Sequence, residues 1–377
     1  MHNGGEEAAN VRHSPRQRID QQCREARRKS VDGPLRPTEV EAALLTPNKL
    51  QQLHVQRQRN QLLTNIVSIR PGDIVRQWKE SQLGILVRFI AVEDHLEHIG
   101  EPIDPDLDIG DALSTATPLK VRITTSSSPL DLDLTLTSTI LTIASLLPPI
   151  SRFEIGTIRC IGLNYYLHAK EMSLPIPTYP SLFFKPATAF GVPSAPLIIP
   201  HQATDNQADC EAELAFVIGK TCRNVCKADA ERYILGYMCS NDVTARKWQF
   251  AGGNSQWGYG KGFDGFAPMR PCLVSSRKIK LSDVGMVEVR TEVNGEVLQH
   301  GRGDDMTFGV AEVVEHLSRG TTLEAGTVVM QGTPPGIGVS RVPPRWLEDG
   351  DEVRIIGSHG LGSLVNQVVY GREPDEK

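Results

Sequence analysis

The strongest constraint on the fold of this chain is one stretch, DCEAELAFVIGK, in which two acidic side chains precede an apolar run. Side chains alternate between the two faces of a strand, so Glu211 and Glu213 should share a face. The opposite, apolar face would consist of Leu214, Phe216 and Ile218. Two carboxylates at the start of a buried strand repel each other, and both stay ionised only when a cation lies between them.

A third carboxylate, Asp242, follows another apolar stretch, YILGYMC, and could complete a set of oxygen ligands. Oxygen ligands without Cys or His favour a hard cation such as Mg²⁺, Mn²⁺ or Ca²⁺. Spacing alone leaves a simpler alternative open, because Glu-x-Glu is common. In that alternative, Glu211 and Glu213 line a solvated edge strand.

The rest of the body indicates strands more often than helices. Alternation in VEVRTEV (residues 287–293), followed by Asn294-Gly295, predicts a β-hairpin. A single amphipathic helix is indicated by apolar residues at i, i+3, i+4 and i+7, namely Val310, Val313, Val314 and Leu317. Regular βαβ crossovers are missing. We therefore predict a β-rich α+β fold, mostly antiparallel, with peripheral helices.

The formal net charge of −5 combines a basic extension with an acidic body. Residues 1–80 hold 14 Lys+Arg against 9 Asp+Glu and are poor in aromatic residues. Such a stretch cannot bury enough apolar surface to fold alone, so we expect a disordered extension. Composition and turn signals then predict a small N-terminal β module at 81–150, a catalytic domain at 151–372 and a short tail at 373–377.

Composition also excludes several classes of function. The mild acidity argues against a nucleic-acid binder, which needs a basic face. No run of about 18 apolar residues is present, so we expect no membrane span. No apolar segment typical of a secretory signal lies near the N-terminus, and we expect a cytoplasmic protein. The Arg-rich start leaves mitochondria as the alternative.

Seven motifs in a fixed order make the sequence resemble the fumarylacetoacetate hydrolase (FAH) superfamily, in its acylpyruvase and fumarylpyruvate hydrolase-like branch. Each motif alone is modest, but the ordered set is specific. The motifs are CIGLNYYLHAKEM, SLFFKPATAF, DCEAELAFVIGK, SNDVTARKWQ, KGFDGFAP, QGTPPGIG and EDGDEVRI…GLGSLVNQVV. The resemblance implies a mixed β-sandwich roll fold in the catalytic domain, a homodimer and one divalent cation, Mg²⁺ first, with Mn²⁺ or Ca²⁺ as alternatives.

The resemblance also assigns the chemistry to residues. By position in the motifs, Glu211, Glu213 and Asp242 match the three metal carboxylates. His168 and Glu171 match a His-x-x-Glu pair on a short lid helix, where residues at i and i+3 share a face and Glu171 can orient the imidazole. Without the resemblance, a surface ion pair would be the simpler interpretation.

Further positions carry over in the same way. Lys261 matches a lysine that stabilises negative charge developing on an enolate or oxyanion, although most lysines simply lie at the surface. Gln249 and Thr333 match substrate-contacting positions. Arg246 is either a further contact to a substrate carboxylate or a structural arginine.

The sequence departs from the family pattern in several places. Lys247 stands where an acid usually follows Thr-Ala-Arg, and Gly303 replaces a Thr or Ser before an Asp-Met pair. The loops around 173–180 and 251–259 are the least family-like, which leaves the natural substrate open.

The predicted function is metal-dependent hydrolysis of a carbon–carbon bond in a β-diketo acid of acylpyruvate or fumarylpyruvate type. The alternative uses the same site without attack by water, as an oxaloacetate tautomerase or decarboxylase or a 2-hydroxydienoate isomerase. A third hypothesis is a non-catalytic metal-binding paralogue. The first two predict a small 2-oxo or β-diketo acid as the ligand.

Overall fold

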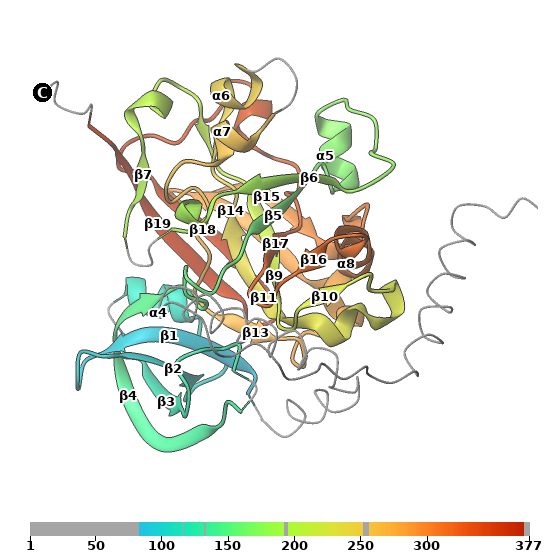
Figure 1. Ribbon diagram of the computed structural model, residues 1–377. Helices are drawn as coiled ribbons and strands as arrows, with labels where there is room; N and C mark the ends of the chain where they lie inside the picture. Colours follow the sequence, from blue (N-terminus) through green and yellow to red (C-terminus); the bar gives the residue numbers. More distant parts are fainter. Residues whose placement is uncertain (1–82, 116, 132, 192–194, 252–255, 373–377) are drawn as a thin grey trace, which may run out of the picture. The chain divides into compact units, whose positions relative to one another are not determined.

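The computed structural model describes residues 83–115, 117–131, 133–191, 195–251 and 256–372 (Figure 1). The predicted extension at 1–80 and the tail at 373–377 lie outside the described residues. Contacts divide the chain into two units, Met1–Arg70 and Pro71–Lys377, and every described residue belongs to the second. In the part of the chain that is described, no helix is both long and apolar enough to cross a membrane.

A ten-stranded sheet organises the described residues (Figure 1). Neighbouring strands are antiparallel except for one parallel pair, β17 with β5. In spatial order the strands are β2 (Glu97–Pro102), β3 (Lys120–Thr124), β4 (Leu136–Leu147), β1 (Ile85–Ala91), β13 (Leu273–Ser275), β11 (Ile234–Asn241), β9 (Ala212–Ile218), β17 (Val328–Met330), β5 (Ile158–Gly162) and β6 (Ser181–Lys185).

A second sheet has five strands, with a parallel pair at one edge where β19 meets β7. Its order is β15 (Glu296–Arg302), β14 (Glu288–Val293), β18 (Glu352–Gly357), β19 (Gly362–Tyr370) and β7 (Leu197–Ile199). Two short pairs complete the strands: β10 (Cys222–Arg223) with β16 (Thr322–Leu323), and β12 (Thr244–Ala245) with β8 (Ala208–Asp209). The α-helices are short: α4 (Ile109–Ser114), α5 (Tyr166–Glu171), α6 (Arg246–Ala251), α7 (Gly258–Lys261) and α8 (Val310–Ser318).

The local predictions for the hairpin and the helix are confirmed. Strands β14 and β15 pair across Asn294 and Gly295, whose φ angles of 52° and 81° are those of the tight hairpin turn that Asn-Gly favours. Helix α8 buries the four predicted apolar residues. Strands dominate the described residues, so the β-rich prediction holds as well.

Strand β9 lies inside the ten-stranded sheet, between β11 and β17, and every residue of it is buried. Its alternate side chains enter two different apolar clusters. Leu214, Phe216 and Ile218 belong to one cluster, while Ala215 and Val217 belong to the other. The alternative of a solvated edge strand is therefore wrong, and the acidic residues at the start of β9 are held in the interior.

The strands before residue 150 share the large sheet with those after it. Within the first group, β1 pairs with both β2 and β4, and β1 also pairs with β13 through Ile85 and Val274. The sheet is thus continuous across the predicted boundary between 81–150 and 151–372. The boundaries themselves stay predictions.

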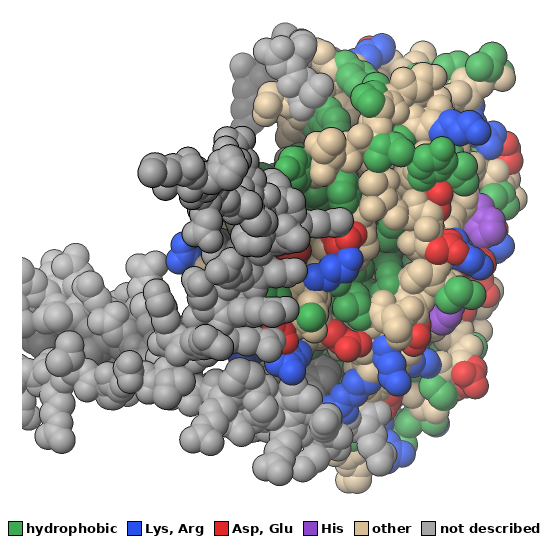
Figure 2. Space-filling view, turned by 90° about the vertical axis from the view of Figure 1, so that its right-hand side faces the viewer, with side chains coloured by type: hydrophobic (Ala, Val, Ile, Leu, Met, Phe, Trp, Pro, Cys, Tyr) green, Lys and Arg blue, Asp and Glu red, His purple; other side chains and the backbone are tan. Residues whose placement is uncertain are grey.

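The face turned to the viewer in Figure 2 carries basic and acidic side chains close to one another, with hydrophobic side chains scattered between them. This mixture gives that face no broad potential of one sign.

Candidate active site

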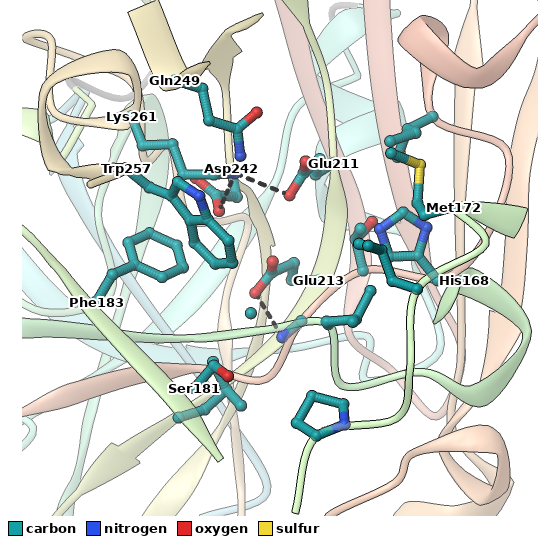
Figure 3. A pocket seen from close by; sticks show the side chains of 18 of the residues that line it. His168, Met172, Ser181, Phe183, Glu211, Glu213, Asp242, Gln249, Trp257 and Lys261 are labelled. Atoms are coloured by element: carbon teal, nitrogen blue, oxygen red, sulfur yellow. Dashed lines mark hydrogen bonds and ion pairs between the residues drawn. The ribbon is translucent and has the colours of Figure 1, made fainter. Parts of the chain in front are cut away.

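The three predicted metal ligands meet at neighbouring ends of β9 and β11. In the register of these strands Ser240 lies opposite Glu213, so Asp242 follows directly beside the start of β9. The backbone N–H of Asp242 donates to the carbonyl of Glu211 at 2.8 Å, which holds the backbones of the two residues side by side. One carboxylate oxygen from each of Glu211, Glu213 and Asp242 lies within 4.8 Å of the others, and all three residues are buried (Figure 3).

Lys261, at the end of α7, reaches the same cluster. Its ammonium donates to Glu211 Oε2 at 3.0 Å, to Asp242 Oδ2 at 2.8 Å and to the Thr244 hydroxyl at 2.7 Å. Burial lowers the pKa of Lys261, but the charges of Asp242 and Glu211 outweigh burial and raise it. Lys261 is therefore a permanent cation at this site and not a surface lysine.

A second buried lysine, Lys185 at the end of β6, approaches Asp242 from the other side. Its ammonium lies 2.5 Å from Asp242 Oδ1 and donates to the carbonyls of Val243 at 3.2 Å and Phe266 at 2.5 Å. Both carboxylate oxygens of Asp242 thus face a lysine, and the side chain is fixed in one orientation.

Arg246 joins the carboxylate cluster to a fourth acid, Asp209. The Arg246 guanidinium lies 2.6 Å from Glu211 Oε1 and 2.8 Å from Asp209 Oδ2. Asp209 also accepts backbone hydrogen bonds from Gly338 at 2.9 Å and Val339 at 3.0 Å. Arg246 is engaged with carboxylates of the protein itself, and Asp209 ties it to the loop that follows β17.

The electrostatics of the cluster leave room for an added cation. When all four buried acids are ionised they outnumber the three buried cations by one, so one negative charge is uncompensated (Asp209, Glu211, Glu213 and Asp242 against Lys185, Arg246 and Lys261). Burial raises the pKa of Glu211, but Lys261 and Arg246 outweigh it and lower the pKa to about 2. For Glu213, burial together with the charges of Asp242 and Glu211 raises the pKa well above its ordinary value.

The residues present fit a divalent cation. The donor set consists of carboxylate oxygens, which hard cations such as Mg²⁺ prefer, and the three oxygens converge on one point. A divalent cation would turn the residual negative charge into a positive one, which suits an anionic ligand. Glu211, Glu213 and Asp242 would hold it.

The predicted proton-transfer pair, His168 and Glu171, lies on α5, and His168 stands beside the carboxylates in the cavity (Figure 3). His168 Nδ1 is 2.8 Å from Glu171 Oε2, and His168 is buried. With the Nδ1 proton donated to Glu171, Nε2 carries the lone pair that can accept a proton from water. The geometry is that of a base and its orienting carboxylate, not of an exposed ion pair.

The other oxygen of Glu171 ties α5 to the loop after β17. Glu171 Oε1 accepts from the Gly336 backbone N–H at 2.8 Å and from the Ser340 hydroxyl at 2.6 Å. Gly336 has φ 102°, and a Cβ there would lie 2.1 Å from the Leu298 carbonyl oxygen, so only glycine fits this turn. Burial raises the pKa of Glu171, but the bonds from His168, Ser340 and Gly336 outweigh it and lower the pKa.

The two predicted substrate contacts differ in what they offer. Gln249 accepts from Arg246 at 3.0 Å through its amide oxygen, which leaves its amide nitrogen for a ligand. The Thr333 hydroxyl donates to the Ala212 carbonyl at 3.0 Å and accepts from Gln299 Nε2 at 2.7 Å. Thr333 lines the cavity, but its proton is already committed to the protein.

The departures from the family pattern fall outside the carboxylate cluster. Lys247 is largely exposed and forms a surface ion pair with Asp205 at 2.6 Å. Gly303 packs so closely that a Cβ would lie 2.0 Å from the Val284 carbonyl oxygen. Two residues later, Asp305 accepts from the Leu167 backbone N–H at 3.1 Å and so holds the start of α5.

All nine predicted site residues except Glu171 line one cavity of about 390 Å³, and Glu171 reaches it through His168. Sequence reasoning missed Lys185, Asp209 and Ser340. A weak signal existed for two of them, because Lys185 interrupts the apolar SLFFKP stretch and Asp209 opens the acidic motif. For Ser340 the sequence carries no signal.

The fold and this site together bring three carboxylates suited to a cation into one cavity with a buried histidine that contacts a glutamate. The pattern of the family described as fumarylacetoacetate (FAA) hydrolase C-terminal matches residues 157–369, more than half of the chain. The chain therefore belongs to the fumarylacetoacetate hydrolase family, and the predicted family, FAH-type fold and enzyme class are confirmed.

Relatives and solved structures agree with this assignment. Caffeoylpyruvate hydrolase of Neonothopanus nambi is 40% identical over 287 residues, covering 75% of this chain and 92% of its own. Oxaloacetate tautomerase fahd2, mitochondrial, of Xenopus laevis is 41% identical over 225 residues, covering 60% and 68%. The crystal structure of 2-hydroxyhepta-2,4-diene-1,7-dioate isomerase from Mycobacterium marinum matches with a TM-score of 0.61 at 32% identity, covering 77% of this chain and 100% of that one.

Proposed function

We propose that this protein is a divalent-metal-dependent hydrolase that cleaves a carbon–carbon bond in a β-diketo acid of acylpyruvate or fumarylpyruvate type. The observation that carries the proposal is His168, oriented by Glu171 at 2.8 Å, in the same cavity as the three carboxylates. Hydrolysis needs a base for water beside a cation site, whereas tautomerisation needs no attacking water. The likeness to caffeoylpyruvate hydrolase, whose substrate by name is an acylpyruvate, supports the same conclusion.

In this proposal each side chain has one task. His168 removes a proton from water, whose oxygen forms a bond to the distal acyl carbonyl carbon. The bond from that carbon to the methylene carbon then breaks, and its electron pair leaves as the enolate of pyruvate. Lys261 stabilises the negative charge of the enolate, and the amide nitrogen of Gln249 holds the carboxylate end. Protonation of the enolate carbon gives pyruvate, and the acyl part leaves as a carboxylic acid.

A bound divalent cation would supply a Lewis acid for the carboxylate and 2-oxo oxygens of the substrate. Mg²⁺ is our first choice, with Mn²⁺ or Ca²⁺ as alternatives. The proposal also includes a homodimeric state and a location in the cytoplasm or in mitochondria. The name of the Xenopus laevis relative places that protein in mitochondria.

The test is hydrolysis of acetylpyruvate with Mg²⁺ or Mn²⁺, followed as loss of the β-diketo absorbance. His168→Ala should lower kcat by roughly 10²- to 10⁴-fold, the usual contribution of a positioned base. The matched control is His300→Ala, because His300 forms an exposed pair with Glu288 at 3.2 Å outside the cavity. Equal activity of the His168→Ala variant and the unmodified protein would contradict the proposal.

The second candidate is oxaloacetate tautomerase activity, which the 41% identity with the Xenopus laevis relative favours. The same cation site and base would suffice, since the reaction only moves a proton between carbon and oxygen. Following the enol absorbance of oxaloacetate beside acetylpyruvate loss separates the two. The non-catalytic alternative loses the support of one departure, because Lys247 lies in a surface ion pair with Asp205.

A further inference from the structure

The cavity has a second part that the proposed chemistry does not use. Its lining also includes aromatic and long aliphatic side chains: Phe183 and Trp257 lie together on one side of the carboxylates, Met172 lies beside His168, and Leu174 and Phe250 also line the cavity (Figure 3). Leu174 and Trp257 come from the two loops that are least like the family in sequence. A reaction that involves only the carboxylates, Lys261 and His168 would leave these apolar side chains without a ligand to contact.

Phe183 and Trp257 form an apolar wall of the cavity. Their ring centroids are 5.4 Å apart at an interplanar angle of 75°, an edge-to-face pair (Figure 3). One edge of the indole packs against Gly162, where a Cβ would come within 2.1 Å of the ring. A glycine at this position of β5 is therefore what lets the indole approach the strand so closely.

The aromatic pair lies next to Lys261 of the carboxylate cluster. The Lys261 ammonium lies 5.4 Å from the centroid of Phe183, within the range of a cation–π contact. The indole N–H of Trp257 is buried and has no acceptor among the described residues, although buried indoles usually find one. A ligand that leaves the carboxylate cluster in this direction meets aromatic rings first and an unsatisfied donor beside them.

We propose that the wall formed by Phe183 and Trp257 binds the acyl arm of the substrate, and that this arm is planar and apolar, as in an aryl- or enoyl-pyruvate. The inference rests on the proposed function, because the carboxylate end must lie at the cation site for the arm to reach the wall. Aromatic rings favour flat conjugated groups. A cavity of about 390 Å³ is large enough for a ligand that carries a ring or a conjugated chain beyond its 2-oxo acid end. A four-carbon acid such as oxaloacetate would leave the wall uncovered.

The test compares benzoylpyruvate with acetylpyruvate, which share the reacting atoms and differ in the arm. The unmodified protein should have the higher kcat/KM with benzoylpyruvate. Trp257→Ala should lower kcat/KM for benzoylpyruvate by roughly 10- to 200-fold, the range over which an apolar pocket discriminates, and for acetylpyruvate by less than about threefold. The matched control is Trp248→Ala, because Trp248 donates to Gln202 and does not line this cavity.

Gly162→Ala provides a second variant that keeps every aromatic side chain. Its methyl group would displace the indole, so it should reduce the preference for benzoylpyruvate in the same direction as Trp257→Ala. If both variants keep the preference of the unmodified protein, or if that protein prefers acetylpyruvate, the acyl-wall proposal is overturned.

A binding measurement separates this proposal from the hydrolase proposal. With Mg²⁺ present, isothermal titration gives Kd for both compounds whether or not they are cleaved. Tighter binding of benzoylpyruvate that disappears in Trp257→Ala supports the wall, even if no product forms and the hydrolase proposal fails. Cleavage of both compounds with equal Kd and equal kcat/KM supports the hydrolase and refutes the wall.

Discussion

Replacing Lys185 by methionine removes one of the three cations at the carboxylate cluster and keeps an unbranched side chain of similar length. The Lys185 ammonium lies 2.5 Å from Asp242 Oδ1, and the side-chain exposures are 0% and 1%. The variant would leave this oxygen without its buried cation and the carbonyls of Val243 and Phe266 without their buried donor. No solvent reaches the pair to replace the lost contacts.

Breaking a buried ion pair by removing one partner costs about 3–5 kcal/mol, because the other charge stays buried and uncompensated. For a domain of nearly 300 residues, an unfolding entropy of about 2.1 cal/mol/K per residue means that each kcal/mol lowers the Tm by roughly 1.7 °C, so the expected fall is about 5–9 °C. Loss of the Lys185 charge also makes the cluster more negative by one charge, which a divalent cation would offset. The fall in Tm should therefore be larger in EDTA than in saturating Mg²⁺.

Thermal unfolding followed by circular dichroism measures the effect, and Lys227→Met is the matched control. Lys227 also lies 2.5 Å from a carboxylate, Glu312, but its side chain is 56% exposed, and such pairs contribute about 0–1 kcal/mol. A double variant, Lys185→Met with Asp242→Asn, removes both charges and should recover part of the lost stability. Equal Tm changes for Lys185→Met and Lys227→Met would refute the assignment of a buried charge pair.

Three further outcomes follow from the site. Ser340→Ala removes a donor that lowers the pKa of Glu171, so the acid limb of the pH–activity profile should shift to higher pH by up to about one unit. The kcat above pH 8 should change little, and Ser340→Thr should restore the original acid limb. Chelation with EDTA should abolish turnover, and Mn²⁺ should restore it except in Glu211→Ala. In the metal-free protein the raised pKa of Glu213 gives a contribution to stability that is fully present below the unfolded pKa of about 4.5 and is lost as pH rises through the raised folded pKa, because the folded state keeps the proton. Glu213→Gln should remove this contribution to the pH dependence of urea unfolding.

The parts of the fold that could be predicted from sequence are those that depend on near neighbours. Alternation along β9 and the Asn-Gly turn between β14 and β15 are local properties of the backbone, and both are confirmed. The three carboxylates could be grouped because Glu211 and Glu213 are two residues apart at the start of one strand and the third, Asp242, follows a similar strand. Even so, spacing could not show that β9 is flanked by β11 and β17, since that pairing joins distant segments.

The supporting residues could not be predicted for the same physical reason. Ser340 contacts Glu171 across 169 residues of sequence. A single serine in a Gly/Pro loop belongs to no periodic pattern from which its partner could be predicted. Lys185 is distinctive only once β6 is known to end beside Asp242. A lysine near the end of an apolar strand is ordinarily at the surface, and only the tertiary structure shows that this one is buried.

The site therefore has two parts: a charged part held mainly by the ends of strands, and an apolar part to which a loop contributes. The carboxylates and lysines stand at the ends of β6, β9 and β11 and at α7, on rigid elements, where a cation and an enolate need accurate placement. The apolar wall takes Trp257 from a loop, and loops tolerate change more readily than strands. Hydrolysis and tautomerisation would share the first part, so the difference between them lies in how the substrate's arm is held. An arm bound against Trp257 would keep the acyl carbonyl fixed for attack by the water that His168 activates, whereas oxaloacetate has no arm to bind there.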